Sequence, residues 1–311
     1  MRNVFADQVT QLAGEDDRIV LLSGDIGNKL FDRFKERFPK RFYNCGVAEQ
    51  NMISVAAGLA LSGLRPVVYT ITPFTTTRCY EQIRVDLCYH HAPVVVVGTG
   101  SGLSYAELGP THHSLEDLAI MRVLPDMTVL APCDEAELRA CLTSAFKLAG
   151  PAYIRIGKKG EPKVHAKPPN FAIGSALPLS RGSDICLVAT GTIVPTANAA
   201  ADILRTRGFS VGVISMPTVK PLDTACLADI FANYRMVATI EEHSRVGGLG
   251  SAVAEWCADA SSQRAQHVIF GADDRFLHEI GSQDYARRVS GLAVESIVLG
   301  CSARLGTLVE I

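Results

Sequence analysis

The chain has 311 residues, about twice the usual domain size, so two domains are expected. Its 30 basic and 32 acidic residues give a net charge of −2, which provides no positive surface for nucleic acid or an anionic membrane. No apolar run approaches the ~18 residues of a membrane span, and nine scattered cysteines without CxxC pairs suit a reducing compartment. We therefore expect a cytoplasmic protein whose partners are small molecules or other proteins.

Short β-rich runs alternate with helical patterns through the first half of the chain. The runs are apolar throughout, which indicates strands buried on both faces of a mainly parallel sheet covered by helices. They occupy residues 18–24, 65–71, 93–100, 127–132 and 152–157. Residues 1–160 are therefore predicted to form a doubly wound α/β domain.

The alternation breaks and then resumes in the second half. Residues 161–182 are rich in proline, glycine and basic residues, which predicts a linker. Apolar runs return at residues 184–191, 209–216, 235–242 and 266–272. Residues 183–311 are therefore predicted to form a second, smaller doubly wound α/β domain.

One carboxylate, Glu49, stands at the start of an apolar helical pattern. It follows a strand-like run at residues 41–44, and apolar residues recur at helical spacing after it until Gly63. Such an acid either satisfies the free amide groups of the first helical turn or acts as a catalytic group in an apolar setting. Position alone favours the first interpretation.

Two loops carry further candidates. Phe74 lies in a turn marked by Pro73, where an aromatic ring is either a platform for a ligand or a core residue at a corner. Residues 109–114 place His112 and His113 before the helical pattern SLEDLAIMRVL. These histidines either pack locally or serve a site, and without other ligands at suitable spacing they make a weak zinc site.

Two glycine-rich segments leave several interpretations open. GTGSG at residues 98–102 follows a strand but lacks the GxGxxG spacing and the helix of a dinucleotide-binding turn. Its glycines indicate that the backbone passes close to a ligand or to a neighbouring loop. Residues 241–256 join a strand to a helix through paired glycines, an arrangement that suits an anion at a helix N-terminus, tight packing or an interface.

Taken together and in order, a series of motifs resembles the C-terminal half of transketolases. They are GVAEQN, a PF turn followed by RCYEQIR, GPTHH before SLEDLAIMR, PDMTVLAPCDEAE, GPAYIRIGK, SMPTVKPLD and EEHSRVGGLGSAVAE. The resemblance covers nearly the whole chain and is greatest to the split form, in which transketolase is made as two polypeptides. It implies a thiamine diphosphate pyrimidine-binding domain, a transketolase C-terminal domain, and transfer of a two-carbon ketol unit from a ketose to an aldehyde acceptor.

The resemblance also assigns roles to residues. Glu49 matches the glutamate that hydrogen-bonds the aminopyrimidine ring of the cofactor and promotes its activation. Phe74 matches the aromatic ring stacked on that pyrimidine, and His112 matches the histidine that faces the reacting carbons. Asp25 and Ile26 fall where the family makes further contacts with the cofactor.

Positions near the expected substrate depart from the family's pattern. Leu108 stands where transketolases carry an aspartate that binds a substrate hydroxyl, and Gly100 stands where they carry a phosphate-contacting histidine. Lys158 lies near the position of their phosphate-contacting arginine, and lysine binds phosphate without the bidentate fork. Arg78, one turn after Phe74, is a further substrate candidate whose alternative role is a structural ion pair. We therefore expect ketol transfer with a non-standard sugar.

The diphosphate motif of the superfamily, GDG followed by asparagine, is missing. GDI at residues 24–26, with Asn44 downstream, lacks the last glycine. The resemblance therefore implies that this chain supplies no metal ligand and needs an N-terminal transketolase subunit, which holds thiamine diphosphate through Mg²⁺ in an α2β2 heterotetramer. Two other functions fit this kind of chain: the β subunit of a 2-oxoacid dehydrogenase or acyloin-forming enzyme, and a noncatalytic interaction subunit.

Overall fold

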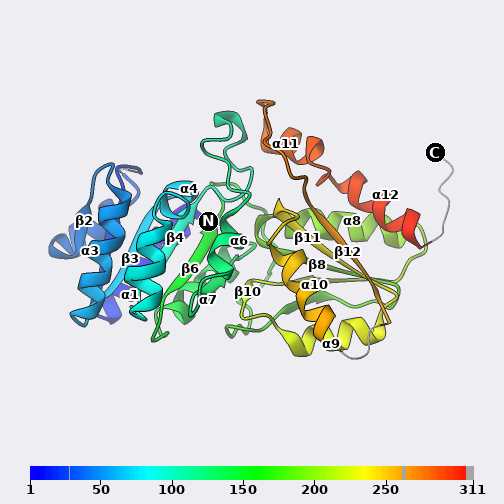
Figure 1. Ribbon diagram of the computed structural model, residues 1–311, viewed down its shortest axis with the longest axis horizontal. Coiled ribbons are helices and arrows are strands. Elements are labelled where there is room, and N and C mark those ends of the chain that lie inside the picture. The colour runs from blue at the N-terminus through cyan, green and yellow to red at the C-terminus, as the bar shows by residue number, and fades with distance from the viewer. Residues whose placement is uncertain (28, 261–263, 306–311) are drawn as a thin grey trace.

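The computed structural model describes residues 1–27, 29–260 and 264–305. Two α/β domains, each built on its own sheet, lie side by side along the long axis of the molecule (Figure 1). Residues 306–311, the end of the predicted second domain, lie outside the described residues. Within the described ranges, no helix has the length and apolar character needed to cross a membrane.

The first domain contains a seven-stranded sheet in which all strands except one edge strand run parallel. Across the sheet the order is β10 (Thr218–Lys220), β5 (Thr128–Leu130), β6 (Ala152–Ile156), β4 (Val95–Thr99), β3 (Arg65–Ile71), β1 (Ile19–Ser23) and β2 (Phe42–Asn44). Each of the five apolar runs predicted in this half forms one of these strands.

Helices cover both faces of this sheet, which explains its continuous apolar strands. Successive strand residues point to opposite faces, so Leu22 belongs to one core and Leu21 to the other. The first core is covered by α3 (Glu49–Leu61), a π-helical segment (Ile83–Tyr89) and α6 (Asp117–Arg122), and the second by α1 (Arg2–Glu15), α2 (Asp32–Arg37) and α7 (Glu135–Ala145). Short helices in the loops are Pro39–Arg41, α4 (Thr72–Thr75), α5 (Tyr80–Gln82) and Ala106–Leu108.

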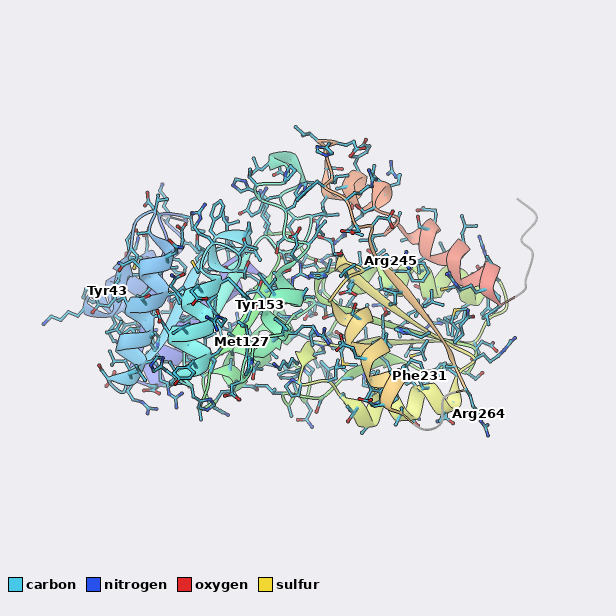
Figure 2. The ribbon with its side chains drawn as sticks, in the orientation of Figure 1. Tyr43, Met127, Tyr153, Phe231, Arg245 and Arg264 are labelled. Atoms are coloured by element: carbon cyan, nitrogen blue, oxygen red, sulfur yellow. The ribbon has the colours of Figure 1, made fainter. Side chains whose placement is uncertain are left out.

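The second domain repeats this plan on a five-stranded sheet. Its order is β12 (Gln266–Ala272), β11 (Met236–Ser244), β8 (Ile185–Thr190), β9 (Val211–Ser215) and β7 (Leu177–Ser180). A 3₁₀ turn (Gly191–Ile193), α8 (Val194–Thr206) and α12 (Val294–Arg304) cover one face, and α9 (Thr224–Asn233) and α10 (Leu249–Asp259) the other. Figure 2 shows Tyr153 in the first domain and Phe231 in the second, each buried in its own core. The doubly wound α/β class predicted for both domains is confirmed.

Two short edge strands differ from the predicted boundaries. β7 lies inside residues 161–182, predicted as a linker, and pairs antiparallel with β9. β10 comes after β9 in the sequence, yet it closes the first sheet by pairing antiparallel with β5. Strands of three or four residues carry too little periodicity to be found from sequence, and only the packing of the domains decides which sheet they join.

Candidate active site

The carboxyl edge of the first sheet collects the predicted site residues. Because the strands are parallel, the loops after β6, β4, β3, β1 and β2 emerge at the same edge. β1 pairs with β2 on one side and with β3 on the other. The strands that follow β1 in the sequence therefore lie on both sides of it, and the strand order reverses at this point. Open α/β sheets bind ligands at such a point. Glu49 follows β2, Phe74 and Arg78 follow β3, His112 follows β4, and Lys158 follows β6.

Glu49 is the first residue of α3, as the sequence predicted. Its side chain is 6% exposed, and Arg78 Nη1 donates a hydrogen bond to its Oε2 at 2.8 Å. α3 continues with core residues such as Met52 and Ile53, and it ends just before Gly63, whose φ is 94°. The helix therefore anchors one buried carboxylate at the sheet edge beside a cation.

Arg78 covers the ring of Phe74. Its Cζ lies 4.1 Å from the ring centroid while its Nη1 donates to Glu49. Phe74 lies on α4 and is half-buried. A flat cation thus stacks on an aromatic face and bonds a carboxylate at the same time. Of the two roles considered for Arg78, the structure shows the ion pair.

His112 also contacts Phe74, with ring centroids 5.3 Å apart in an edge-on arrangement. The Thr111 hydroxyl lies 2.9 Å from its Nδ1. Burial, and after it the neighbouring His113, lower the pKa of His112, which favours the neutral ring. His113 is buried and lies 3.4 Å from a backbone carbonyl of the same loop. One histidine thus faces the candidate site while the other packs locally.

Tyr105 extends the site and was missed by sequence reasoning. Its ring lies 5.9 Å from the ring of His112 and 4.4 Å from Lys158 Nζ, measured to its centroid. A Cβ on Gly100, which has a φ of 79°, would collide with this ring. Gly100 therefore leaves space for the ring of Tyr105. The glycines of GTGSG indicated a close approach to a ligand or a neighbouring loop, and the Tyr105 ring is one of the groups approached.

Lys158 forms an ion pair with Glu107, the residue before Leu108. The hydrogen bond from Lys158 lowers the pKa of Glu107, so the acid is ionised beside the lysine. Leu108 is 48% exposed. Contacts are thus continuous along what we call the edge row, made of Glu49, Arg78, Phe74, His112, Tyr105 and Lys158.

Asp25 and Ile26 lie after β1, but they contact other groups. Asn44 Nδ2 donates to Asp25 Oδ1 at 3.1 Å, and the Asp25 amide donates to the Gly46 carbonyl at 3.1 Å. Ile26 packs against the core beneath α1 and α2. Within the described ranges, neither residue makes a hydrogen bond, ion pair or ring contact with the edge row. Asp25 therefore supports the turn between β2 and Glu49.

One group of possible metal ligands occurs among the described residues, outside the edge row. Cys133, Glu137 and His165 place their ligand atoms within 4.8 Å of one another. Glu137 accepts the Cys133 amide at 2.7 Å and lies 2.8 Å from His165 Nε2, a hydrogen bond that raises the pKa of His165. A hollow of about 750 Å³ adjoins this group, and its lining includes Asp134, Arg139 and His165. The Glu137 carboxylate already bonds the Cys133 amide and the His165 ring, so this group attaches the segment around His165 to α7.

The fold and the edge row define a two-domain α/β protein with a candidate ligand site at the carboxyl edge of its first sheet. Known families match both domains. Residues 1–162 match the family described as transketolase, pyrimidine binding domain, and residues 174–296 match transketolase, C-terminal domain. The chain belongs to the transketolase family, which confirms the resemblance.

Relatives of similar length are separate subunits. The 6-deoxy-6-sulfo-D-fructose transketolase subunit SqwH of Clostridium sp. is 36% identical over 299 residues, covering 96% of this chain and 92% of that protein. One of the subunits of the apulose-4-phosphate transketolase of Phocaeicola vulgatus is 35% identical over 256 residues, 82% of each chain. A solved structure described as a split gene transketolase, inactive beta4 tetramer, is 34% identical, covers 98% of this chain and 97% of its own, and superposes with a TM-score of 0.89.

Proposed function

We propose that this chain is the C-terminal subunit of a split transketolase, and that it uses thiamine diphosphate to move a two-carbon ketol unit from a ketose to an aldehyde. The observation that carries this proposal is that Arg78 connects a buried carboxylate, Glu49, to the ring of Phe74 at the strand switch point. His112 stands next to Phe74, where a reacting group would meet it.

Arg78 provides a test of whether this site fits the cofactor. Its guanidinium is flat, bears N–H groups, stacks on Phe74 and donates to Glu49. An aminopyrimidine ring has the same properties: it is flat, it stacks on an aromatic face, and its protonated ring nitrogen donates to a carboxylate. The residues present therefore fit the pyrimidine, and Arg78 would leave this position when the cofactor binds.

Three residues of this chain would do most of the local work. Glu49 would accept a hydrogen bond from the pyrimidine and hold a proton on that ring. Phe74 would fix the ring plane, and His112, with its lowered pKa, would bond substrate oxygens as a neutral ring. Positioned acid–base groups of this kind typically contribute about a hundredfold or more to the rate. The bound thiamine diphosphate itself supplies the carbanion chemistry.

A second polypeptide would complete the site. This chain lacks the GDG and asparagine motif of the superfamily, so an N-terminal transketolase subunit would hold the diphosphate and Mg²⁺ in an α2β2 heterotetramer. The related solved structure is an inactive beta4 tetramer, which supports the need of a β-type chain for its partner. A reducing cytoplasm would suit the scattered cysteines.

The substrate would be a non-standard sugar. Lys158 offers one cation at the end of the edge row, shared with Glu107 and the ring of Tyr105. The exposed Leu108 gives no hydrogen bond to a sugar hydroxyl. Two relatives are named for 6-deoxy-6-sulfo-D-fructose and apulose-4-phosphate, sugars that carry an anionic group. These features support a modified sugar with one anionic substituent.

Reconstitution tests the function. The chain would be mixed with an N-terminal subunit that carries the GDG and asparagine motif, together with thiamine diphosphate and Mg²⁺, and ketol transfer would be followed. Activity is expected only from the mixture. Full-rate transfer by this chain alone, or release of CO₂ from pyruvate as the main reaction of the mixture, would contradict the proposal.

A second assay tests the substrate. The reconstituted complex would be given sulfonated, phosphorylated and uncharged ketoses, and kcat/KM would be compared. A charged, non-standard ketose is expected to be the best donor. A strong preference for xylulose 5-phosphate would count against the proposed substrate class.

A further inference from the structure

The loop that carries His112 packs on the second domain. We call residues 100–115, between β4 and α6, the His112 loop. Figure 1 shows this loop beside α11 (Gln283–Val289) at the top of the view, above the junction of the two domains. A small apolar cluster joins them, made of Leu103, Ala106 and Leu115 from the loop and Ala272, Leu277 and Ala286 from the second domain. The loop therefore has its own core, half of which belongs to the other domain.

Glu242, near the end of β11, bonds this loop directly. Its side chain is 2% exposed, and its Oε1 accepts the backbone N–H of Leu103 at 2.7 Å. Gln283 Nε2 donates to both carboxylate oxygens, at 2.9 and 3.1 Å, and Arg287 forms an ion pair with Oε2. One buried carboxylate thus joins the His112 loop to α11.

Gly102 shows how closely the two segments meet. A Cβ at this position would lie 2.5 Å from Glu242 Oε1 and 2.6 Å from the Glu242 carbonyl. Its φ is 59°, a conformation that glycine adopts without cost. Within GTGSG, Gly102 therefore allows close contact with β11, and Gly100 allows close contact with Tyr105.

The far end of the His112 loop is held by the same strand. Arg155 Nη2 donates to the carbonyls of Ser114, at 3.1 Å, and Glu242, at 3.2 Å. The Ser244 amide donates to the Leu115 carbonyl at 2.8 Å. Tyr105, Glu107 and His112 lie between these two attachments, so their positions depend on β11.

We propose that the second domain positions the His112 loop for the reaction, and that Glu242 is its principal positioning residue. Glu242 acts through the backbone of Leu103 and, within the described ranges, makes no hydrogen bond or ion pair with the edge row itself. The inference rests on the proposed function only in treating His112 as an active-site residue. It gives the second domain a role in setting the geometry of a site whose residues lie on the first.

Amide hydrogen exchange on the intact chain tests this positioning without any activity. In Glu242→Ala, peptides covering residues 101–112 are expected to exchange about tenfold faster or more, while peptides of β8 and β1 keep their protection. Glu242→Gln keeps an oxygen for the Leu103 amide, so it is expected to fall between Ala and the native chain. Glu255→Ala is the matched control, because Glu255 also crosses the domain interface but pairs with Arg122 on α6.

Two outcomes would overturn the positioning role. One is unchanged exchange of the His112 loop in folded Glu242→Ala, and the other is equal acceleration in Glu255→Ala. A second variant tests the same contact by changing the loop, because Gly102→Ala places a methyl group against Glu242. Gly208→Ala is its control, with a φ of 88° and nothing within 4 Å of the added Cβ. Faster loop exchange is expected for Gly102→Ala alone, and equal effects of the two variants would count against the proposal.

The reconstituted complex provides the second measurement. Glu242→Ala is expected to lower kcat about tenfold while the affinity for thiamine diphosphate stays within about twofold, because Glu49 and Phe74 are anchored on α3 and α4. Loss of cofactor affinity at unchanged kcat would contradict the inference. If the native complex shows no ketol transfer, the proposed function fails, and the exchange experiment still decides whether β11 positions the loop.

Discussion

The two domains place acidic residues at the carboxyl edges of similar sheets, but they use them differently. In the first domain, Glu49 contacts Arg78, whose side chain is 41% exposed and lies on the ring of Phe74. In the second domain, Glu241, Glu242 and His243 lie near the end of β11, and all of them are 2% exposed or less. The acid of the first edge is covered by a partly exposed arginine side chain, whereas the acids of the second edge are enclosed by the chain itself.

Glu241 shows how the second edge is closed. Its carboxylate accepts the backbone N–H groups of Leu249 at 2.7 Å and Gly250 at 2.8 Å, at the start of α10. Burial raises the pKa of Glu241, and the nearby His243 and these amides oppose that change. The anion that the glycine-rich segment 241–256 could bind is therefore its own glutamate, which supports tight packing among the three interpretations of the sequence.

This contrast teaches that an acid beside a helix N-terminus is not by itself evidence for a site. The buried carboxylate of Glu241 accepts hydrogen bonds from free amides at the start of α10, so its charge stabilises the fold. Glu49 lies at a similar place, but its partner is a partly exposed arginine stacked on an aromatic ring. The nature of the partner distinguishes the two cases, and mutation of each acid should therefore change a different property.

Glu49→Gln should have the largest effect, on activity. We expect ketol transfer by the reconstituted complex to fall about a thousandfold or more, because the amide cannot take up the pyrimidine proton. The free energy of unfolding should change by less than about 1 kcal/mol, since Arg78 remains partly solvated. Glu81→Gln, an exposed acid paired with Arg84, is the control and should leave both properties unchanged. Equal activity of the Glu49 and Glu81 variants would indicate a noncatalytic subunit.

Glu241→Ala should show the reverse pattern. Removing the carboxylate leaves two buried amides of α10 without an acceptor, so we expect a loss of about 3 kcal/mol in unfolding free energy. Chemical denaturation measures this loss, and the folded variant should keep its cofactor affinity. Glu295→Ala, an exposed acid in the first turn of α12, should cost little. Unchanged stability of Glu241→Ala would break the comparison between the two edges.

His267 extends the comparison to pH. Burial lowers its pKa to about 4, from 6.5 in the unfolded chain, beside the Thr239 hydroxyl at 3.1 Å. Above pH 6.5 the ring is neutral in both states; below it the unfolded chain binds a proton that the folded chain does not. Stability should therefore fall as the pH drops from about 6.5 toward 4, by about 2 kcal/mol at pH 5.

Denaturation at pH 8 and pH 5 checks this effect. His267→Leu should lose much of the pH dependence, whereas His278→Gln, at an exposed position, should keep it. The same slope in both variants would show that other groups cause the loss of stability.

Leu108→Asp should have the smallest effect, confined to substrate preference. An aspartate at this exposed position would bind a sugar hydroxyl, so we expect kcat/KM for a hydroxyl-rich ketose phosphate to rise about fivefold, or about 1 kcal/mol. Leu299→Asp is a matched control, because Leu299 is 49% exposed and Leu108 is 48% exposed. A similar change in both variants would mean that residue 108 does not contact the substrate.

Much of the fold and several site residues were predictable from local sequence. Apolar runs are long enough to mark each central strand, and helical spacing after Glu49 places it at the start of α3. The family motifs lie in loops that follow these strands, so they indicate Phe74 and His112 as well. The sequence alone thus determined the fold class, the family and the edge at which the candidate site lies, because these depend on residues close together in the chain.

Only the tertiary structure decided how those residues are used. It places Arg78 between Glu49 and Phe74, sets the ring of Tyr105 in the space left by Gly100, and shows that Glu241 closes its own helix. It also brings Glu242 to the His112 loop, 139 residues away in sequence. Such contacts depend on strand order and side-chain packing across domains, which local patterns of polarity do not record.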